Sequence, residues 1–384
     1  MVSFSPDIGH RELTFADRVR GISWGLILLL CVLSGIGFAM LYSAANGNWQ
    51  PWASKQVVRF AIAFVPMITA ALIDIRYWFR IAYWVYGLAL ALVVAVDLRG
   101  FAGMGAQRWI DLGFFQLQPS EVMKVALILG LARYFHVLPT ENAGRITHLL
   151  VPVGMVMVPV ALVLKQPDLG TAMTLLAAGA IVFFLAGVRL WMFGAAAVAA
   201  AGAAPLIWSM LRDYQRARLT TFLSPNSDPL GAGYHILQSK IALGSGGLFG
   251  KGFMLGTQTH LAFLPERQTD FIFTMIAEEF GLVGGLVLLA LYALVIVYGF
   301  TIALRSRNHF GRILGLGLAT NFFLYVFINT AMVIGLIPVV GVPLPLISYG
   351  GSAMVTVMLG FGLLMNVSIH RDVRINRLGE SQVL

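Results

Sequence analysis

The sequence has 384 residues, of which 59% are hydrophobic and only 11% are charged. Soluble domains average roughly 45–50% apolar and about 25% charged residues, so this composition excludes a soluble globular domain and places most of the chain in lipid. The formal net charge of +9 does not indicate nucleic-acid binding, because the basic residues lie in short segments between apolar runs, as expected from the charge rule of membrane orientation.

Apolar windows long enough to cross a bilayer, about 17–25 residues, recur from residue 22 to residue 367. The first window is too long for the apolar core of a cleaved signal peptide, which is usually about 7–15 residues. A proline and charged residues at 165–170 predict a turn between two neighbouring windows. The sequence therefore predicts an all-α integral membrane protein, a single polytopic domain over 1–384 with about ten transmembrane helices. These helices are expected near 22–42, 57–74, 79–97, 118–135, 149–164, 169–188, 190–211, 270–304, 313–336 and 349–367.

The basic residues give the predicted helices an orientation. With the N-terminus inside, the inner segments hold 14 of the 26 basic residues and the short outer segments and adjoining helix ends hold six, which favours cytoplasmic termini. The inner residues are Arg11, Arg18, Arg20, Arg76, Arg80, Arg133, Arg145, Arg189, Arg305, Arg307, Arg312, Arg371, Arg374 and Arg377. The outer residues are Lys55, Arg59, Arg99, Arg108, Lys124 and Lys165. The expected organisation is a cytoplasmic N-terminus at 1–21, helices one to seven in 22–211, an outer loop at 212–269, helices eight to ten in 270–367 and a cytoplasmic tail at 368–384.

The long outer loop at 212–269 is the part of the chain most unlike the rest in composition. Loops longer than about 12–15 residues are usually functional or disordered, and this one is expected to form short helices on the membrane surface. Its glycine-rich run at 244–252 lacks the Lys-Ser/Thr pair of a P-loop and follows no strand. Glycine N–H groups and loop cations could bind a diphosphate, although cations beside anionic lipids also act as surface anchors. The cations are Arg216, Arg218, Lys240, Lys251 and Arg267.

Charged residues at membrane depth are expensive and often functional. Glu121 and Lys124 lie three residues apart, on one face of the fourth predicted helix. They are either functional or a structural ion pair that holds helices together. Asp168 opens the sixth predicted helix.

Asp270 opens the eighth predicted helix, where the chain leaves the outer loop. This position lies within reach of water and lipid head groups, so a functional role is favoured over the alternative, an N-terminal helix cap. Glu278 and Glu279 lie about two turns deeper. They are expected to be buried structural groups, because depth disfavours free ionisation.

No His or Cys cluster has the spacing of a zinc site, no nucleophile elbow is present, and no carboxylate cage for a metal is evident. The sequence therefore assigns no metal ligands. A divalent cation such as Mg²⁺ or Mn²⁺ remains compatible with a diphosphate leaving group.

Several ordered stretches resemble one known family. They lie at 118–124, 165–172, 233–239, 265–273, 278–281 and 343–352. Over nearly its whole length the chain is similar to the SEDS family (shape, elongation, division and sporulation), and within it to the branch that serves rod-shape elongation. Gln268 departs from the family, whose members often have His there.

The resemblance implies a peptidoglycan glycosyltransferase of the bacterial inner membrane with its active site on the outer side. The implied substrate is lipid II, undecaprenyl diphosphate carrying the disaccharide-pentapeptide. The implied partners are a class B penicillin-binding protein (the transpeptidase) and other membrane proteins of the elongation complex. The family's essential aspartate falls on Asp270, with Lys124 as its ion-pair partner. The candidate substrate-binding residues are Glu121, Asp168, Arg216, Arg218, Lys240, Lys251, Arg267 and Ser348.

Three other functions remain open. A lipid II flippase would also suit ten helices with buried charges, although the paired broken helices of many transporters are not evident in the sequence. A scaffold without chemistry is a second alternative. The third is the division-specific paralogue of the same family, which shares most of the motifs.

Overall fold

The structure is a computed structural model that describes residues 13–99, 101–103, 106–111, 116–211, 213–224, 232–260 and 266–376. Arg11, Arg377 and Pro265 lie outside these ranges. Every predicted membrane window coincides with helix, so the prediction of an all-α membrane protein is confirmed. The corresponding helices are α2 (Trp24–Ala44), α3 (Ala53–Leu72), α4 (Ile75–Arg99), α5 (Pro119–Val137), α6 (Ile146–Lys165), α7 (Leu169–Leu185), α8 (Leu190–Gly202) with α9 (Ala204–Met210), α13 (Ile272–Arg305), α14 (His309–Ile334) and α15 (Gly351–Ile369).

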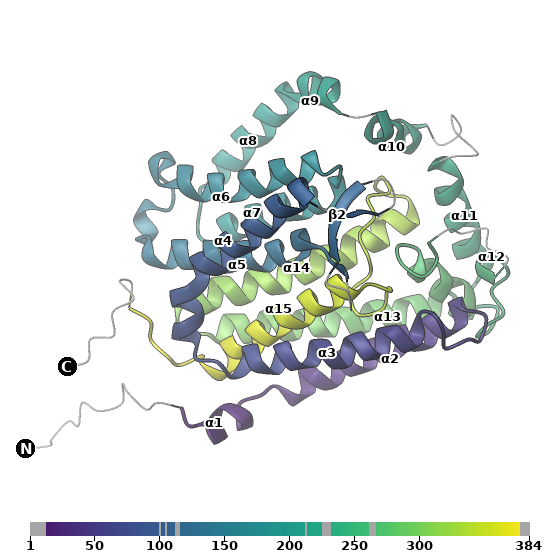
Figure 1. The fold of residues 1–384 in the computed structure, drawn as a ribbon, viewed down its shortest axis with the longest axis horizontal. Helices are drawn as coiled ribbons and strands as arrows, with labels where there is room; N and C mark the ends of the chain where they lie inside the picture. Colours follow the sequence, from purple (N-terminus) through teal and green to yellow (C-terminus); the bar gives the residue numbers. More distant parts are fainter. Residues whose placement is uncertain are drawn as a thin grey trace, which may run out of the picture.

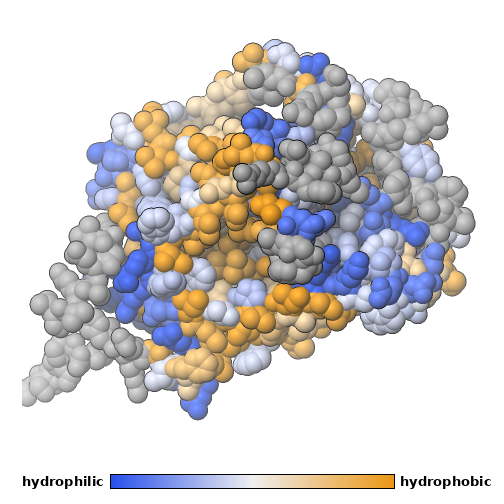
Figure 2. Space-filling model, in the orientation of Figure 1, coloured by the Kyte–Doolittle hydropathy of each residue, from blue (hydrophilic) through white to orange (hydrophobic). Residues whose placement is uncertain are grey.

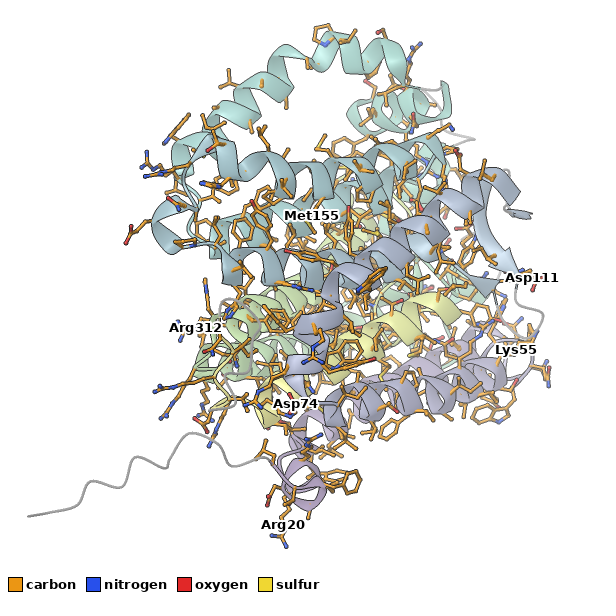
Figure 3. All side chains as sticks on the ribbon, turned by 60° about the vertical axis from the view of Figure 1, so that its left-hand side comes forward. Arg20, Lys55, Asp74, Asp111, Met155 and Arg312 are labelled. Atoms are coloured by element: carbon orange, nitrogen blue, oxygen red, sulfur yellow. The ribbon has the colours of Figure 1, made fainter. Side chains whose placement is uncertain are left out.

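Among the described helices, seven are long and apolar enough to cross a membrane, and α7 and α8 are shorter apolar helices. The long helices run side by side along one direction (Figure 1). Apolar side chains cover the middle of the visible face and hydrophilic ones gather toward its two ends (Figure 2). Arg20, Asp74 and Arg312 lie at one end, and Lys55 and Asp111 lie at the opposite end (Figure 3). An apolar belt between polar ends is the arrangement that a bilayer requires.

The connection between α4 and α5 contains a small sheet that the sequence did not predict. Its strands are β1 (Phe101–Gly103), β2 (Ala106–Asp111) and β3 (Gln116–Leu117), paired antiparallel in the order β1-β2-β3. Ser352 at the start of α15 binds the end of this sheet, because its hydroxyl donates to the Gln116 carbonyl at 2.7 Å and accepts the Gln118 N–H at 2.9 Å. The sheet is thereby fixed at the end of the bundle where α15 begins.

The seventh predicted helix is divided. The chain forms α8 and α9 with a break at Ala203 between them. No residue of α8 is buried, and the two helices pass along one edge of the bundle toward α10 (Asp213–Leu223) (Figure 1). The predicted short helices of the outer loop are present as α10, α11 (Ala232–Ser245) and α12 (Thr257–His260).

The eighth predicted helix, α13, is broken at Gly281, whose φ of 67° and ψ of −164° are not helical. The glycine-rich run fills this break. Its backbone and that of α13 exchange hydrogen bonds from Lys251 N to Glu278 O (3.1 Å), Gly252 N to Glu279 O (2.9 Å), Leu282 N to Gly247 O (2.9 Å) and Val283 N to Leu248 O (3.1 Å). The expectation that this run offers its N–H groups to a diphosphate is therefore wrong for Lys251 and Gly252, whose N–H groups bind α13 carbonyls instead.

The break at Gly281 gives a testable stability prediction. An alanine Cβ there would lie 2.4 Å from the Gly250 nitrogen, in a backbone conformation that only glycine adopts readily. We expect Gly281→Ala to lower the free energy of unfolding by at least about 1–3 kcal/mol, measured as a lower thermal midpoint in detergent. Gly244→Ala is the matched control, because a Cβ at Gly244 meets nothing within 4 Å. Equal midpoints for the two variants would contradict the prediction.

Candidate active site

Asp270 lies where the outer loop meets α13, and its side chain is half-buried. The residue at the N-cap of α13 is Phe271, and no side chain caps this helix. Within the described part of the chain, the Asp270 carboxylate accepts no hydrogen bond. The alternative of a helix cap is therefore wrong, and the carboxylate is left available for chemistry.

The backbone around Asp270 is held from two sides. The Asn329 amide of α14 donates to the carbonyls of Asp270 at 2.9 Å and Val342 at 2.7 Å. The Ser348 hydroxyl donates to the Thr269 carbonyl at 2.6 Å and accepts the Leu344 N–H at 2.8 Å. Ser348 was expected to bind substrate, but its hydroxyl proton is already used to position the segment that carries Asp270.

The Asp270 carboxyl group has a strongly raised pKa. The pKa of its carboxyl group is raised to about 7, mainly by burial and also by the neighbouring charges of Glu266 and Asp168, while the charge of Arg218 opposes the rise. These neighbours come from separate segments: Glu266 and Arg218 from the outer loop, and Asp168 from the start of α7. A carboxylate with a pKa near neutrality is suited to accept a proton in catalysis.

Asp168 has a structural role that accounts for its buried side chain. It is the N-cap of α7, where its carboxylate accepts hydrogen bonds from the Thr171 N–H at 3.1 Å and the Thr171 hydroxyl at 2.9 Å. It also accepts one from the Gln118 amide at 3.0 Å, which joins the start of α5 to α7. Asp168 thus acts on Asp270 through its charge.

Lys124 and Glu121 form a buried ion pair with an Nζ–Oε1 distance of 2.7 Å. The Tyr325 hydroxyl of α14 donates to the other Glu121 oxygen at 2.5 Å, and the Lys124 ammonium lies 4.2 Å from the centroid of the Tyr325 ring. Among the described residues, Lys124 makes no ion pair with Asp270. That expectation is wrong for this structure, because Glu121 is one turn away on the same helix and supplies the carboxylate.

Two of the loop cations are used elsewhere. Lys251 forms an ion pair of 2.8 Å with the fully buried Glu278, which also accepts the Gln258 N–H at 2.9 Å. Arg216 donates to the carbonyls of Trp208 and Ser209 at 3.0 and 2.8 Å, and so binds α9. Neither cation is among the charges that shift the Asp270 pKa.

The remaining loop cations are Arg218, Arg267 and Lys240. Arg218 donates to the Val339 carbonyl at 3.2 Å and is the cation that opposes the rise in the Asp270 pKa. Arg267 is half-buried, and burial lowers its pKa. Lys240 is exposed and lies against Gly335 at the end of α14. Arg218 is therefore the loop cation whose charge acts on Asp270.

The deeper acidic pair behaves as expected. Glu278 and Glu279 are both fully buried. Ser43 of α2 donates to Glu279 at 2.5 Å, and Lys251 binds Glu278. Their prediction as buried structural groups is confirmed.

Sequence reasoning missed Tyr325 and Asn329, which connect α14 to Glu121 and to the Asp270 backbone. Both are polar residues in a predicted membrane helix, at a spacing of four that puts them on one face. That pattern was the available signal. No group of three or more His, Cys, Asp or Glu side chains that could hold a metal ion occurs within the described ranges.

Comparisons with known proteins agree with the predicted resemblance. Residues 22–373 match the FtsW/RodA/SpoVE family of cell cycle proteins. The chain is 46% identical over 365 residues to the peptidoglycan glycosyltransferase MrdB of Escherichia coli K12, covering 94% of this chain and 96% of that protein. It is 36% identical to a probable peptidoglycan glycosyltransferase FtsW of Trichlorobacter lovleyi, covering 89% and 92%. A chain from a peptidoglycan synthase complex, described as coordinating polymerization and crosslinking, superposes with a TM-score of 0.80 at 32% identity and covers 91% of this chain and 98% of that one.

Proposed function

Since the chain belongs to the FtsW/RodA/SpoVE family, we propose that it is a peptidoglycan glycosyltransferase that polymerises lipid II into glycan strands. The observation that carries this proposal is the Asp270 carboxylate, which accepts no hydrogen bond within the described part of the chain and has a pKa raised to about 7. A proton acceptor of this kind, at the end of the bundle that carries the outer loop, is what glycosyl transfer to a sugar hydroxyl requires.

The reaction is a single displacement. Asp270 removes the proton from the 4-hydroxyl of the acceptor N-acetylglucosamine, whose oxygen attacks the anomeric carbon of the lipid-linked N-acetylmuramic acid. A carbon–oxygen bond forms as the bond from that carbon to the diphosphate breaks, and undecaprenyl diphosphate leaves with the electron pair. Attack from the face opposite the diphosphate converts an α-linked donor into a β-1,4 bond. Arg218, the cation whose charge acts on Asp270, would stabilise the departing charge.

A divalent cation would have only a pair of carboxylates to bind here, since no group of three or more His, Cys, Asp or Glu side chains that could hold a metal ion occurs in the part of the chain that the structure describes. Asp270 and the neighbouring Glu266 offer the carboxylate oxygens that Mg²⁺ or Mn²⁺ binds, whereas the Asp168 carboxylate is occupied by Thr171 and Gln118. When bound, such an ion would neutralise diphosphate charge.

We assign the protein to cell-wall elongation and rod shape, with a class B penicillin-binding protein as its crosslinking partner. The identity to the MrdB relative is 46%, against 36% to the FtsW relative, which supports elongation over division. The similarity to a chain of a complex that couples polymerization with crosslinking supports the partner.

Both termini are proposed to lie in the cytoplasm, with the outer loop and Asp270 outside the inner membrane. Arg20 and Arg312 at one end of the bundle (Figure 3) support this orientation. A reporter fused after Leu384 should be active only in the cytoplasm, and activity only outside it would reverse the topology.

The assay for the function uses purified lipid II with the detergent-solubilised protein. Polymer formed away from any bilayer identifies an enzyme. Lipid movement in vesicles without polymer would identify a flippase instead. If neither polymer nor lipid movement is observed, the protein is a scaffold.

The pH dependence of polymerisation should follow Asp270. Its carboxyl group is protonated below its raised pKa of about 7 and ionised above it, so the base form is gained as pH rises. We expect kcat/KM to rise about tenfold per pH unit up to about pH 7 and then to level off. The measurement is the initial rate of polymerisation at low substrate as a function of pH.

Two substitutions should move this midpoint in opposite directions. Glu266→Gln removes a negative charge that raises the Asp270 pKa, so the midpoint should fall. Arg218→Gln removes the positive charge that lowers it, so the midpoint should rise. Shifts of the same sign would exclude Asp270 as the titrating group.

A further inference from the structure

Arg59 carries a guanidinium for which the described residues supply no hydrogen-bond acceptor. It lies in the outer half of α3 and is half-buried. Its Nη1 atom is buried without a hydrogen-bond partner. Across the described residues, no nitrogen of its guanidinium donates a hydrogen bond and no carboxylate lies within 4.0 Å of it. A guanidinium carries five N–H donors and stays charged, so this arrangement is costly unless a ligand completes it.

The groups around Arg59 hold the guanidinium in place without neutralising it. Its Cζ atom lies 4.4 Å from the centroid of the Tyr349 ring, a cation–π contact. It also lies against Gly351, where a Cβ would come within 3.3 Å of the Arg59 Nε atom. Gly351 is the first residue of α15, and Gly350 before it provides no side-chain cap. The guanidinium therefore lies beside the N-terminus of α15, which is the positive end of the helix dipole. An anion between the guanidinium and this helix end would stabilise both positive groups.

This cation lies beside the segment that carries Asp270. The N–H of Tyr349, the residue under the guanidinium, donates to the Gln268 carbonyl at 2.8 Å. Gln268 precedes Asp270 by two residues, a span of at most about 7 Å. Gln56, one turn before Arg59 on α3, fixes the same turn, because its amide donates to the Ser348 carbonyl at 2.9 Å.

We propose that Arg59, held on Tyr349 against the start of α15, binds the diphosphate group of the polyprenyl-linked substrate. The inference rests on the proposed function and adds a substrate-binding residue to it. The diphosphate matches this position in charge, and its oxygens match the planar fork of the guanidinium. Arg59 lies on α3, whereas Arg218 comes from the outer loop, so the two cations would hold the diphosphate from different elements.

The test measures binding, so that it does not depend on polymerisation. Undecaprenyl diphosphate, which carries no sugar to transfer, is titrated against the purified full-length protein in detergent. Arg59→Gln should weaken its affinity by about tenfold to a hundredfold. Arg59→Lys, which keeps the charge but loses the fork, should weaken it by a smaller factor, and it carries the test if Arg59→Gln does not fold. Lys55→Gln is the matched control, because it removes an exposed cation one turn away on the same helix.

Each outcome decides the proposal. Loss of affinity in both Arg59 variants with native binding by Lys55→Gln supports it, even if the native protein makes no polymer and the proposed function fails. Native affinity in Arg59→Gln overturns it. Phosphatidylglycerol is titrated as a second probe. If it binds as tightly as undecaprenyl diphosphate and with the same dependence on Arg59, the site serves phospholipid head groups, which also overturns the proposal.

Discussion

Asp270→Asn is expected to abolish polymerisation while the protein stays folded. Asn preserves the shape of the side chain but cannot accept a proton, and loss of general-base catalysis typically costs about 10²–10⁴-fold in rate. The Asp270 carboxylate accepts no hydrogen bond in the described structure and does not cap α13, so its replacement removes no structural contact. The thermal midpoint should therefore not fall, since Asn also removes the cost of ionising a carboxyl group whose pKa is raised by burial. The measurement is the rate of lipid II polymerisation by purified protein.

Asp111→Asn is the control for this experiment, because Asp111 is an exposed carboxylate at the same end of the molecule (Figure 3). It should polymerise lipid II at the native rate. If Asp270→Asn elongates lipid II near the native rate, the assignment of Asp270 as the base is wrong. Binding to the penicillin-binding partner should survive in both variants, which separates lost chemistry from lost assembly.

The positions of the membrane helices could be predicted from the sequence, because the lipid environment determines them. An apolar stretch in a bilayer has to satisfy its backbone internally, so each apolar window becomes a helix whatever its neighbours are. The break in α13 could not be read in this way, because Gly281 leaves the helix only where the glycine-rich run supplies replacement hydrogen bonds. The sheet at 101–117 depends similarly on contacts to α15.

Features of the candidate site that follow from local sequence could also be predicted, whereas those that depend on tertiary contacts could not. The position of Asp270 at the junction of loop and helix could be predicted, because it follows from local sequence. The partners of the loop cations could not be predicted, because each cation binds a residue that only the tertiary structure brings near. Lys251, for example, pairs with Glu278, which lies 27 residues further along the chain. The composition of the glycine-rich run suggested an anion site, but its backbone forms hydrogen bonds with α13 instead.

The Glu121–Lys124 pair should be the most sensitive structural point of the bundle. Lys124 is 1% exposed and its ammonium is paired with Glu121. Lys124→Met would leave the Glu121 carboxylate buried with the Tyr325 hydroxyl as its one remaining donor among the described residues. Breaking one side of a buried ion pair typically costs about 3–5 kcal/mol, so we expect a large fall in the thermal midpoint and little folded protein.

The double variant Glu121→Gln with Lys124→Met separates the structural role of this pair from a catalytic one. Gln still accepts the Tyr325 hydrogen bond, Met fills the volume of the lysine stem, and no buried charge remains, so stability should return to near the native value. We expect polymerisation to stay at least about a hundredfold below native, because the family resemblance makes Lys124 the partner of the essential aspartate and catalytic hydrogen bonds often form only in the substrate complex. The measurements are the thermal midpoint and the polymerisation rate on the same preparation. A stable double variant with native activity would make Lys124 purely structural and leave Arg218 as the cation that acts on Asp270.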